Sequence, residues 1–383
     1  MRVCAACIED PALQEVVKDN LTELRCDYCE REENQPIACR LDVITDYMRP
    51  FIEEKFCDPA DELPYDSAEG GYQGNCIDSW DLLESFGLLI NNSDLFNDIS
   101  DAFTDHDWCQ RDYYSLSVGV AHRAGWDHFC QIVKNKRRFT FWKEYDRKSN
   151  EYDEEVIHPA QMLPTLEELI GSNVIIEDTG TRFWRVQLLE ADEVPNVASR
   201  FTSPPIDKAF VPNRMTPAGI SMFYGAEELS IAYDEVVSIA NLDEKVAWGV
   251  QFEAVIPLNL LDLATLPTPR SAFTHGGYES RELIGFLHHF RDSLMRPINR
   301  DGHEHIDYVP TQVFTEYVRY EMKTVSGESF HGIRYLSSKA HKPCYVIFAG
   351  QQECLDDIHG RKAPQLLRCV PETLTKCRGP VDA

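Results

Sequence analysis

The sequence predicts a multidomain protein, with a zinc-knuckle segment and a mainly α region followed by an α/β (α+β) domain with a mixed sheet. Three observations support this prediction. At 383 residues the chain is longer than one average domain. Two Cys-x-x-Cys motifs lie near its start, and from about residue 181 the spacing of apolar residues changes from helical to alternating strands and helices. We expect segments at 1–42, 43–165 and 166–383, with the core of the last one at 181–350.

The composition is that of a folded, acidic protein. Hydrophobic residues make up 43% and aromatic residues 11%, which is enough for real cores. The formal net charge of -27 repels phosphate backbones, so nucleic-acid binding is not expected as the main activity. No signal peptide is apparent, and no apolar run approaches the ~18 residues of a membrane span. Thirteen cysteines, an odd number, do not suit a secreted disulfide framework, so we expect a cytoplasmic protein without a membrane partner.

The two cysteine motifs form a candidate metal site from Cys4, Cys7, Cys26 and Cys29. Two such pairs can place four thiolates around one tetrahedral Zn²⁺. Residues 11–24 between them have helical spacing, and a helix there would bring the pairs together. Four thiolates leave no open coordination position, so the expected role is structural. Four free or redox-active thiols are the alternative.

The next part of the chain reads as mainly helical. Apolar residues recur at helical spacing over several stretches, a polar loop is expected at 143–155, and a further helix is expected to begin at Pro164. The helical stretches are 44–52, 80–88, 95–103 and 126–133. Arg123 and His128 form an Arg-x4-His pair, which in HEPN ribonucleases assists RNA cleavage. Chance matches to so short a pattern are common, and Gly125 weakens a helix there, so ordinary structural roles are the default.

The C-terminal half alternates between strands and helices. Strands are expected at 182–186, 333–336 and 344–348, and six apolar residues alternate with others over 246–256. Helices are expected over 278–295 and from residue 311. The sequence has no Gly-x-Gly-x-x-Gly and no P-loop, so neither a Rossmann nor a Walker phosphate site is supported.

The stretch from Asn213 to Glu235 carries the most distinctive chemistry. It places Arg214 in a loop, Tyr224 at the end of an expected strand over 220–224, and Glu235 on a helix that is expected to begin at residue 226. A basic, an aromatic and an acidic residue from three elements suit a pocket that holds an anionic ligand.

Arg185 and the Ser337–Ser338 pair extend this stretch into a candidate dinucleotide site. Arginine forks bind pyrophosphate oxygens, and an aromatic face can stack on nicotinamide. Cleavage of an N-glycosidic bond builds oxocarbenium character on the ribose, which a carboxylate stabilises. Serine hydroxyls can fix the amide or the ribose. The alternative at each position is structural: a surface arginine, a core tyrosine, a helix-face glutamate or strand-end serines.

An ordered set of motifs over most of 181–350 resembles the RES domain family. The motifs are Phe183-Trp184-Arg185-Val186, Asn213-Arg214 with Pro217-x-Gly219, Phe223-Tyr224-Gly225-Ala226, Asp234-Glu235-Val236, Tyr308-Val309-Pro310-Thr311-Gln312 and Gly332 to Ser338. The resemblance implies an ADP-ribosyltransferase-like fold. It also implies an NAD glycohydrolase or phosphorylase, which cleaves the nicotinamide–ribose bond of NAD as bacterial toxins of this family do.

The resemblance also implies roles for individual residues. Arg185 and Arg214 would hold the phosphates and ribose of NAD, and Tyr224 would stack on nicotinamide. Glu235 would be the catalytic acid, and the Ser337–Ser338 pair would complete the pocket. The sequence departs from the compact toxins after Arg214, where it lacks their Gly-Gly-Arg-Trp-Asn pattern.

The cysteine pairs and the region 126–129 resemble the HEPN-like domain found ahead of some RES domains. This resemblance implies that the N-terminal half regulates an NAD-consuming toxin or anti-phage effector. The alternatives are an ADP-ribosyltransferase that modifies a macromolecule, a HEPN-type ribonuclease that uses Arg123 and His128, and a non-enzymatic zinc scaffold. A regulatory protein such as an antitoxin and a homo-oligomer both stay open as partners.

Overall fold

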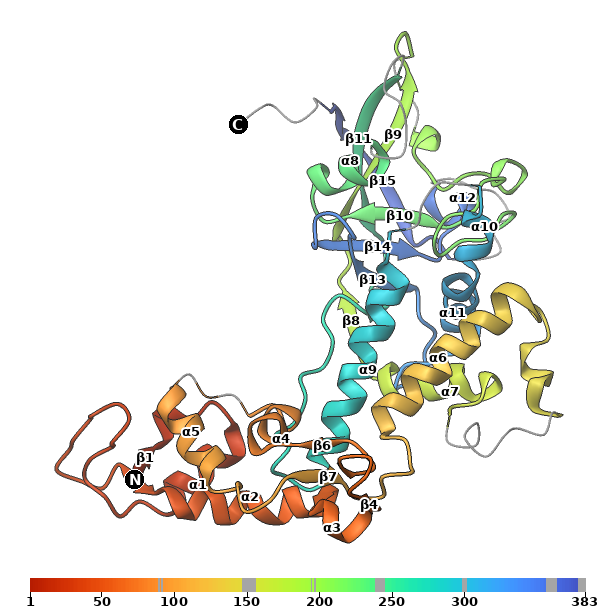
Figure 1. Cartoon of the computed structure of the whole chain (residues 1–383). Helices are drawn as coiled ribbons and strands as arrows, with labels where there is room; N and C mark the ends of the chain where they lie inside the picture. The colour runs from red at the N-terminus through yellow and green to blue at the C-terminus, as the bar shows by residue number, and fades with distance from the viewer. Residues whose placement is uncertain are drawn as a thin grey trace. The chain divides into compact units, whose positions relative to one another are not determined.

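The structure is a computed structural model, and contacts within the chain divide it into two compact units (Figure 1). Unit 1 comprises Met1–His122 and Thr268–Phe286, and unit 2 comprises Arg123–Pro267 and Leu287–Ala383. The residues that the structure describes are 1–88, 90, 92–146, 156–193, 195, 198–237, 245–297, 302–355 and 364–377. Among them, every helix is too short or too polar to cross a membrane.

Unit 1 is built from short helices and very short strands. Its elements are β1 (Arg2–Cys4), α1 (Pro11–Asp19), β2 (Ala38–Arg40), α2 (Leu41–Lys55), β3 (Phe56–Cys57), α3 (Pro59–Glu62), β4 (Tyr65–Asp66), β5 (Gly71–Tyr72), β6 (Cys76–Ile77), α4 (Ser79–Ser85), α5 (Ser93–Asp101) and β7 (Trp108–Gln110), with a 3-10 turn at Ala5–Cys7. Helix α1 starts where the Asp10 carboxylate accepts hydrogen bonds from the backbone N–H groups of Ala12 and Leu13, with Pro11 at the first helical position.

One hydrophobic core joins the helices of unit 1. Leu13, Ile44 and Leu82 are fully buried in it, each from a different helix. Phe273 enters the same core from Thr268–Phe286 and stacks on Phe86 at a centroid distance of 5.6 Å. The sequence analysis did not anticipate this return of the chain into unit 1, and the domain boundaries expected there stay predictions.

Unit 2 contains a large sheet with helices beside it. Its elements are α7 (Pro159–Ile170), β8 (Val174–Glu177), β9 (Arg182–Glu190), β10 (Phe223–Ala226), α8 (Leu229–Val237), β11 (Lys245–Ala254), β12 (Leu258–Asp262), α10 (Glu304–Asp307), α11 (Val309–Tyr320), β13 (Gly332–Leu336), β14 (Pro343–Ile347), α12 (Gln351–Cys354) and β15 (Leu367–Lys376), with 3-10 turns at Phe141–Asp146, Ala198–Arg200 and Ile206–Lys208. Two longer helices, α6 (Val118–Asn135) and α9 (Gly277–Met295), contribute residues to both units.

The sheet of unit 2 has eight strands in the order β15-β11-β9-β10-β14-β13-β12-β8. The β12–β13 pair is parallel and the other pairs are antiparallel, so the sheet is mixed, as the sequence predicts. The longest ladder joins β11 and β9 and runs in register from Lys245 opposite Glu190 to Glu253 opposite Arg182. Burial follows the alternating sequence pattern at Val250, Phe252 and Ala254, whereas Val246 and Trp248 are only half-buried.

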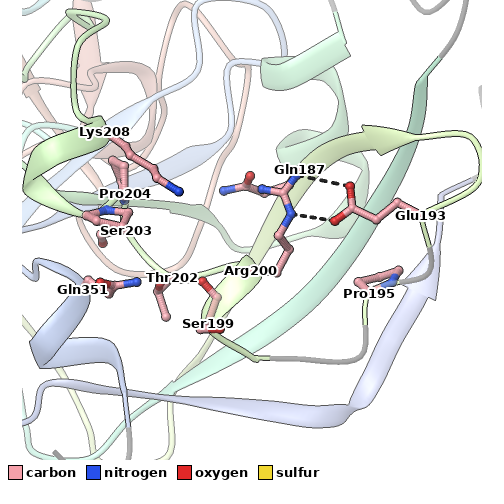
Figure 2. A pocket seen from close by; sticks show the side chains of 11 residues that line it. Gln187, Glu193, Pro195, Ser199, Arg200, Thr202, Ser203, Pro204, Lys208 and Gln351 are labelled. Atoms are coloured by element: carbon pink, nitrogen blue, oxygen red, sulfur yellow. Dashed lines mark hydrogen bonds and ion pairs between the residues drawn. The ribbon is translucent and has the colours of Figure 1, made fainter.

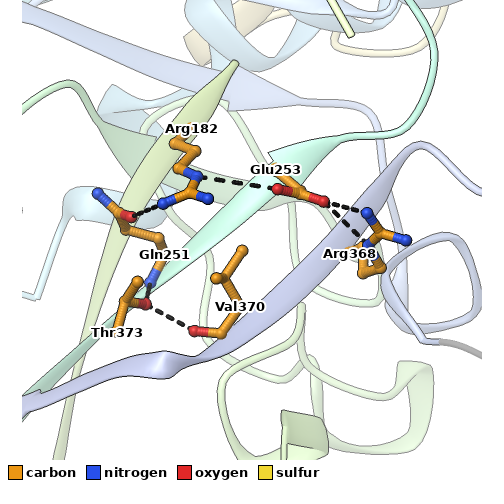
Figure 3. Close-up of polar contacts among 6 residues, drawn as sticks. All are labelled: Arg182, Gln251, Glu253, Arg368, Val370 and Thr373. Carbon is orange, nitrogen blue, oxygen red and sulfur yellow. Dashed lines mark hydrogen bonds and ion pairs between the residues drawn. The ribbon is translucent and has the colours of Figure 1, made fainter. Parts of the chain in front are cut away.

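Polar side chains reinforce the β9–β11–β15 edge of this sheet (Figure 3). Glu253 lies between Arg182, whose Nε is 3.8 Å from one carboxylate oxygen, and Arg368, whose Nε donates to the other at 3.0 Å. The β11–β15 register shifts at Gln251, where the backbone N–H donates to the Thr373 hydroxyl at 2.8 Å. The hydroxyl therefore takes the place of a ladder carbonyl at this bulge.

Three sequence-based boundaries are wrong, and one expected loop lies largely outside the described residues. The helix expected from residue 226 begins at Leu229, because Ala226 is still paired in β10. Helix α7 begins at Pro159 rather than at Pro164, because the His158 side chain accepts a hydrogen bond from Ala160 N at 3.2 Å and caps the earlier start. The strand expected from residue 220 begins only at Phe223. In the loop expected at 143–155, residues 147–155 are not described.

Candidate functional site

Unit 2 contains a cavity of about 740 Å³ that gathers the predicted site residues. We call it the main cavity. Its walls come from β9, the loop before β10, β10 itself, α8, α10 and the ends of β13 and β14. Five of the six predicted residues line it, namely Arg185, Arg214, Tyr224, Glu235 and Ser338. The sixth, Ser337, is hydrogen-bonded to one of these five, so the structure brings all six together.

Arg185 lies in an opening between β9 and β10, which are paired only at Ala226 opposite Trp184. Gly225 permits this close approach, because a Cβ there would lie 3.1 Å from Phe183 Cβ. Beside this contact the two strands separate, and the Arg185 guanidinium fills the space.

The charge of Arg185 has no acidic partner among the described residues. The side chain is only 9% exposed, and its Nη1 and Nη2 donate to the carbonyl oxygens of Tyr224 at 2.8 Å and Thr202 at 3.4 Å. Its Nε is buried without a hydrogen-bond partner. Burial lowers the pKa of Arg185 to about 10. A buried cation with an unused donor at a cavity wall is a site for an anion.

Arg214 is presented by a tight turn. Asn213 N donates to Thr216 O at 2.8 Å and Thr216 N donates back to Asn213 O at 3.2 Å. The Arg214 Nη1 atom donates to the carbonyl oxygens of Leu294 at 2.6 Å and Arg296 at 2.8 Å, at the C-terminal end of α9. The other guanidinium nitrogens make no hydrogen bond to a described residue, so they are available to a ligand.

The amide of Gln312 holds both ends of this turn. Gln312 is 8% exposed, and its Nε2 donates to Asn213 O at 2.9 Å and to Thr216 O at 3.3 Å. The Thr216 hydroxyl in turn lies 2.5 Å from the Tyr224 hydroxyl. Burial raises the pKa of Tyr224 to about 12, so the phenol stays neutral at physiological pH. Sequence reasoning included Gln312 in a motif but gave it no role.

Glu235 is oriented by a buried serine. The Ser337 hydroxyl donates to a Glu235 carboxylate oxygen at 2.5 Å and accepts from the backbone N–H groups of Lys339 and Ala340, each at 3.2 Å. Ser337 is 1% exposed, so these three bonds fix its hydroxyl and the carboxylate that it contacts. Ser338 faces the main cavity itself.

Sequence reasoning missed the contribution of α10. Glu304, His305 and Tyr308 also line the main cavity and add a second carboxylate to it. A helix of only four residues is too short for apolar periodicity to reveal. The motif that begins at Tyr308, directly after α10, was a signal that could have pointed there.

The four cysteines of the N-terminal motifs are brought together in unit 1 as the sequence predicts. Their sulfur atoms all lie within 4.8 Å of one another, with neighbouring Sγ atoms 3.6–3.7 Å apart. Four thiolates at Zn–S bonds of about 2.3 Å around a tetrahedral ion would be about 3.8 Å apart, so the donor set fits such an ion.

The side chains of Arg123 and His128 leave one helix on different sides. Both lie on α6, where five residues correspond to about 140° around the helix axis. The helix continues through Gly125, contrary to the weakness expected there. A Cβ at Gly125 would lie 2.7 Å from Ile157 Cβ, so this glycine permits close packing.

Comparison with protein families agrees with both halves of this description. A model of the RES domain matches residues 182–367, which include all six predicted site residues. The chain therefore contains a RES domain at residues 182–367. A model of the HEPN/RES N-terminal domain 1 matches residues 19–147, which include Cys26, Cys29 and the Arg123–His128 pair. No curated protein and no solved structure matches the chain.

Proposed function

We propose that the RES domain of this chain cleaves the bond between nicotinamide and ribose in NAD, with water or phosphate as the nucleophile. The observation that carries this proposal is that one cavity contains both Arg185 and Glu235. Arg185 is a buried arginine with no acidic partner among the described residues, and Glu235 is a carboxylate oriented by a hydrogen bond. These are the two groups that glycosidic cleavage of a dinucleotide requires: a cation for the pyrophosphate and an anion beside the ribose.

Binding of NAD uses the two arginines and the tyrosine. The free Nε of Arg185 and the unused nitrogens of Arg214 donate to pyrophosphate and ribose oxygens. Tyr224 lines the cavity from β10 and offers its ring to the nicotinamide. Because its hydroxyl is held by Thr216, the ring has a fixed orientation.

In the chemical step, the bond between ribose C1′ and the nicotinamide nitrogen breaks. The bonding electron pair leaves with nicotinamide, which becomes neutral, while positive charge develops on the ribose. Glu235, fixed by Ser337, stabilises this oxocarbenium character. With water as nucleophile, the carboxylate also accepts the proton that water loses on attack. With phosphate, a C1′–O–P linkage forms instead.

This proposal includes a biological setting. A chain that consumes NAD would act as a bacterial toxin or anti-phage effector, with the N-terminal half regulating the RES domain. The cysteine site of unit 1 would hold a structural Zn²⁺.

The test is a time course of NAD loss with the full chain, with and without phosphate. Wild type is compared with Glu235→Gln, and the control is Glu316→Gln, an exposed glutamate on α11. We expect nicotinamide release that Glu235→Gln reduces by at least about 100-fold and the control leaves unchanged. The second product identifies the acceptor: ADP-ribose indicates water, ADP-ribose 1″-phosphate indicates phosphate, and labelled protein indicates a macromolecule. Equal activity in Glu235→Gln and wild type would refute the assignment.

A further inference from the structure

A second cavity, of about 490 Å³, lies in unit 2 (Figure 2). We call it the side cavity. It is lined by Gln187 of β9, by residues between Glu193 and Lys208, and by Gln351 of α12. The lining side chains are prolines or carry hydroxyl, amide or charged groups, with no aromatic ring among them. Such a cavity suits a small polar group and has no ring on which a nucleobase could stack.

Hydrogen-bond donors dominate the side cavity. Arg200 is paired with Glu193, its Nε donating to a carboxylate oxygen at 2.8 Å, so this pair is neutral overall. The Lys208 ammonium and the side-chain amides of Gln187 and Gln351 make no hydrogen bond to any described residue. Figure 2 shows the Lys208 and Gln187 side chains pointing toward each other. An anion between them would accept hydrogen bonds from both the ammonium and the amide N–H groups, and the cavity lining carries one net positive charge within a chain whose net charge is -27.

The side cavity adjoins the main cavity. Gln187 lines both of them. Arg185 stands between the two, because its Nη1 donates to Tyr224 O on the main-cavity side and its Nη2 to Thr202 O in the wall of the side cavity. A ligand phosphate at Arg185 therefore has the side cavity as its neighbour.

The strand order gives the direction of a bound dinucleotide. From β13, which precedes Ser337, the order runs through β14 and β10 to β9, which carries Gln187. Three strand intervals correspond to about 14 Å. With the ribose–nicotinamide bond at Glu235 and the pyrophosphate at Arg185, the adenosine end of the ligand extends beyond Arg185, where Thr202 and Gln187 line the side cavity.

We propose that the side cavity binds a phosphate monoester, and that the RES domain therefore prefers NADP, which carries a phosphate on its adenosine ribose, over NAD. This inference rests on the proposed function. The phosphate dianion accepts hydrogen bonds from the Lys208 ammonium and the Gln187 amide, which are two of the unpaired donors of the cavity. Lys208 then determines specificity without contacting the reacting bond.

The test compares NAD and NADP as substrates and as ligands of the full chain, with Lys208→Ala beside wild type. The control is Lys323→Ala, which removes an exposed lysine that donates only to Ser329. We expect kcat/KM for NADP to exceed that for NAD by about tenfold or more, mainly through KM, because a charge-assisted contact is gained. Lys208→Ala removes this preference and leaves NAD turnover unchanged, and the control changes neither.

Calorimetric binding of both nucleotides to Glu235→Gln gives the same answer without turnover. Tighter binding of NADP to this variant would support the inference. If the wild-type protein cleaved neither nucleotide, the proposed function alone would fail and the inference would stand. Equal kcat/KM and equal affinity for NAD and NADP overturn the inference and leave the proposed function intact. A third outcome is that the protein binds inorganic phosphate, that Lys208→Ala abolishes this binding, and that NADP is not preferred over NAD. This outcome would assign the cavity to free phosphate and overturn the proposed preference for NADP.

Discussion

Two arginines of the same sheet, the buried Arg185 and the half-buried Arg334, lead to opposite predictions. Arg334 of β13 is paired with Asp262, Nη1 to Oδ2 at 3.0 Å, and although burial opposes its charge, Asp262 and Tyr345 raise the pKa of Arg334. Arg185 has no such partner, and burial lowers its pKa from 12.5 to about 10, which corresponds to about 3 kcal/mol of unfavourable charge burial at neutral pH. Its two hydrogen bonds to carbonyl oxygens return about 2 kcal/mol.

Replacement of each arginine by methionine separates the two cases. Arg185→Met removes a buried charge and two hydrogen bonds, so the free energy of unfolding should change by less than about 1 kcal/mol. Arg334→Met leaves the nearly buried Asp262 carboxylate without its cation and should cost about 3 kcal/mol. In thermal unfolding of unit 2, the first variant should melt within about 3 °C of wild type and the second about 6–12 °C lower.

Ligand binding should show the reverse order. Arg185→Met loses the cation at the cavity wall and should weaken NAD binding by about 100-fold, whereas Arg334→Met, measured well below its melting temperature, should bind NAD normally. Calorimetry on both variants checks this. If Arg185→Met melted as low as Arg334→Met and still bound NAD, Arg185 would serve only to join β9 and β10, and the anion-site reasoning would be refuted.

Three further predictions concern positioning, metal and packing. Gln312→Leu should lower kcat about tenfold or more, because it releases the turn that carries Arg214. Thr315→Val, which removes a buried hydrogen bond from the same helix, should lower only the melting temperature, and equal kcat in both variants would contradict the positioning role. Purified protein should contain zinc, which elemental analysis can check. Cys29→Ser or a strong chelator should remove the metal and lower the melting temperature of unit 1, measured by calorimetry. Full stability without metal would exclude a structural role. Gly125→Ala should destabilise unit 2 by about 1–3 kcal/mol, because its Cβ would lie 2.8 Å from a backbone carbonyl oxygen, whereas Gly285→Ala in α9 meets nothing within 4 Å and should be neutral or stabilising.

The sequence was informative where structure is set by local pattern. The strand at 246–256 and the helix at 278–295 were predicted within about two residues, because alternation and helical spacing extend over ten residues or more. Helix α7 was misplaced because the chain offers a proline at 159 and another at 164; the cap at His158 selects the first one, and Pro164 lies inside the helix.

The environment of the site residues could not be predicted in the same way. The sequence identified Arg185 as a candidate, but it did not show that this side chain is buried without an acidic partner. That environment depends on where β9 and β10 separate, which is set by pairing between segments about 40 residues apart. The clamp by Gln312 joins residues 96 to 99 positions apart. Contacts of this range leave no periodic signal in a single sequence.

The distribution of charge along the main cavity suits the charge distribution of NAD. The whole chain is strongly acidic, which by itself would argue against an anionic ligand. The cavity, however, is lined by Arg185, Arg214 and Glu235. In the proposed binding mode the two arginines would lie at the pyrophosphate and Glu235 near the ribose that becomes positive in the reaction. NAD carries its negative charges on the phosphates and its positive charge on the nicotinamide ring, so the ligand can bind favourably in only one direction. In that direction the carboxylate faces the bond that breaks, and the same charges that orient NAD also stabilise its transition state.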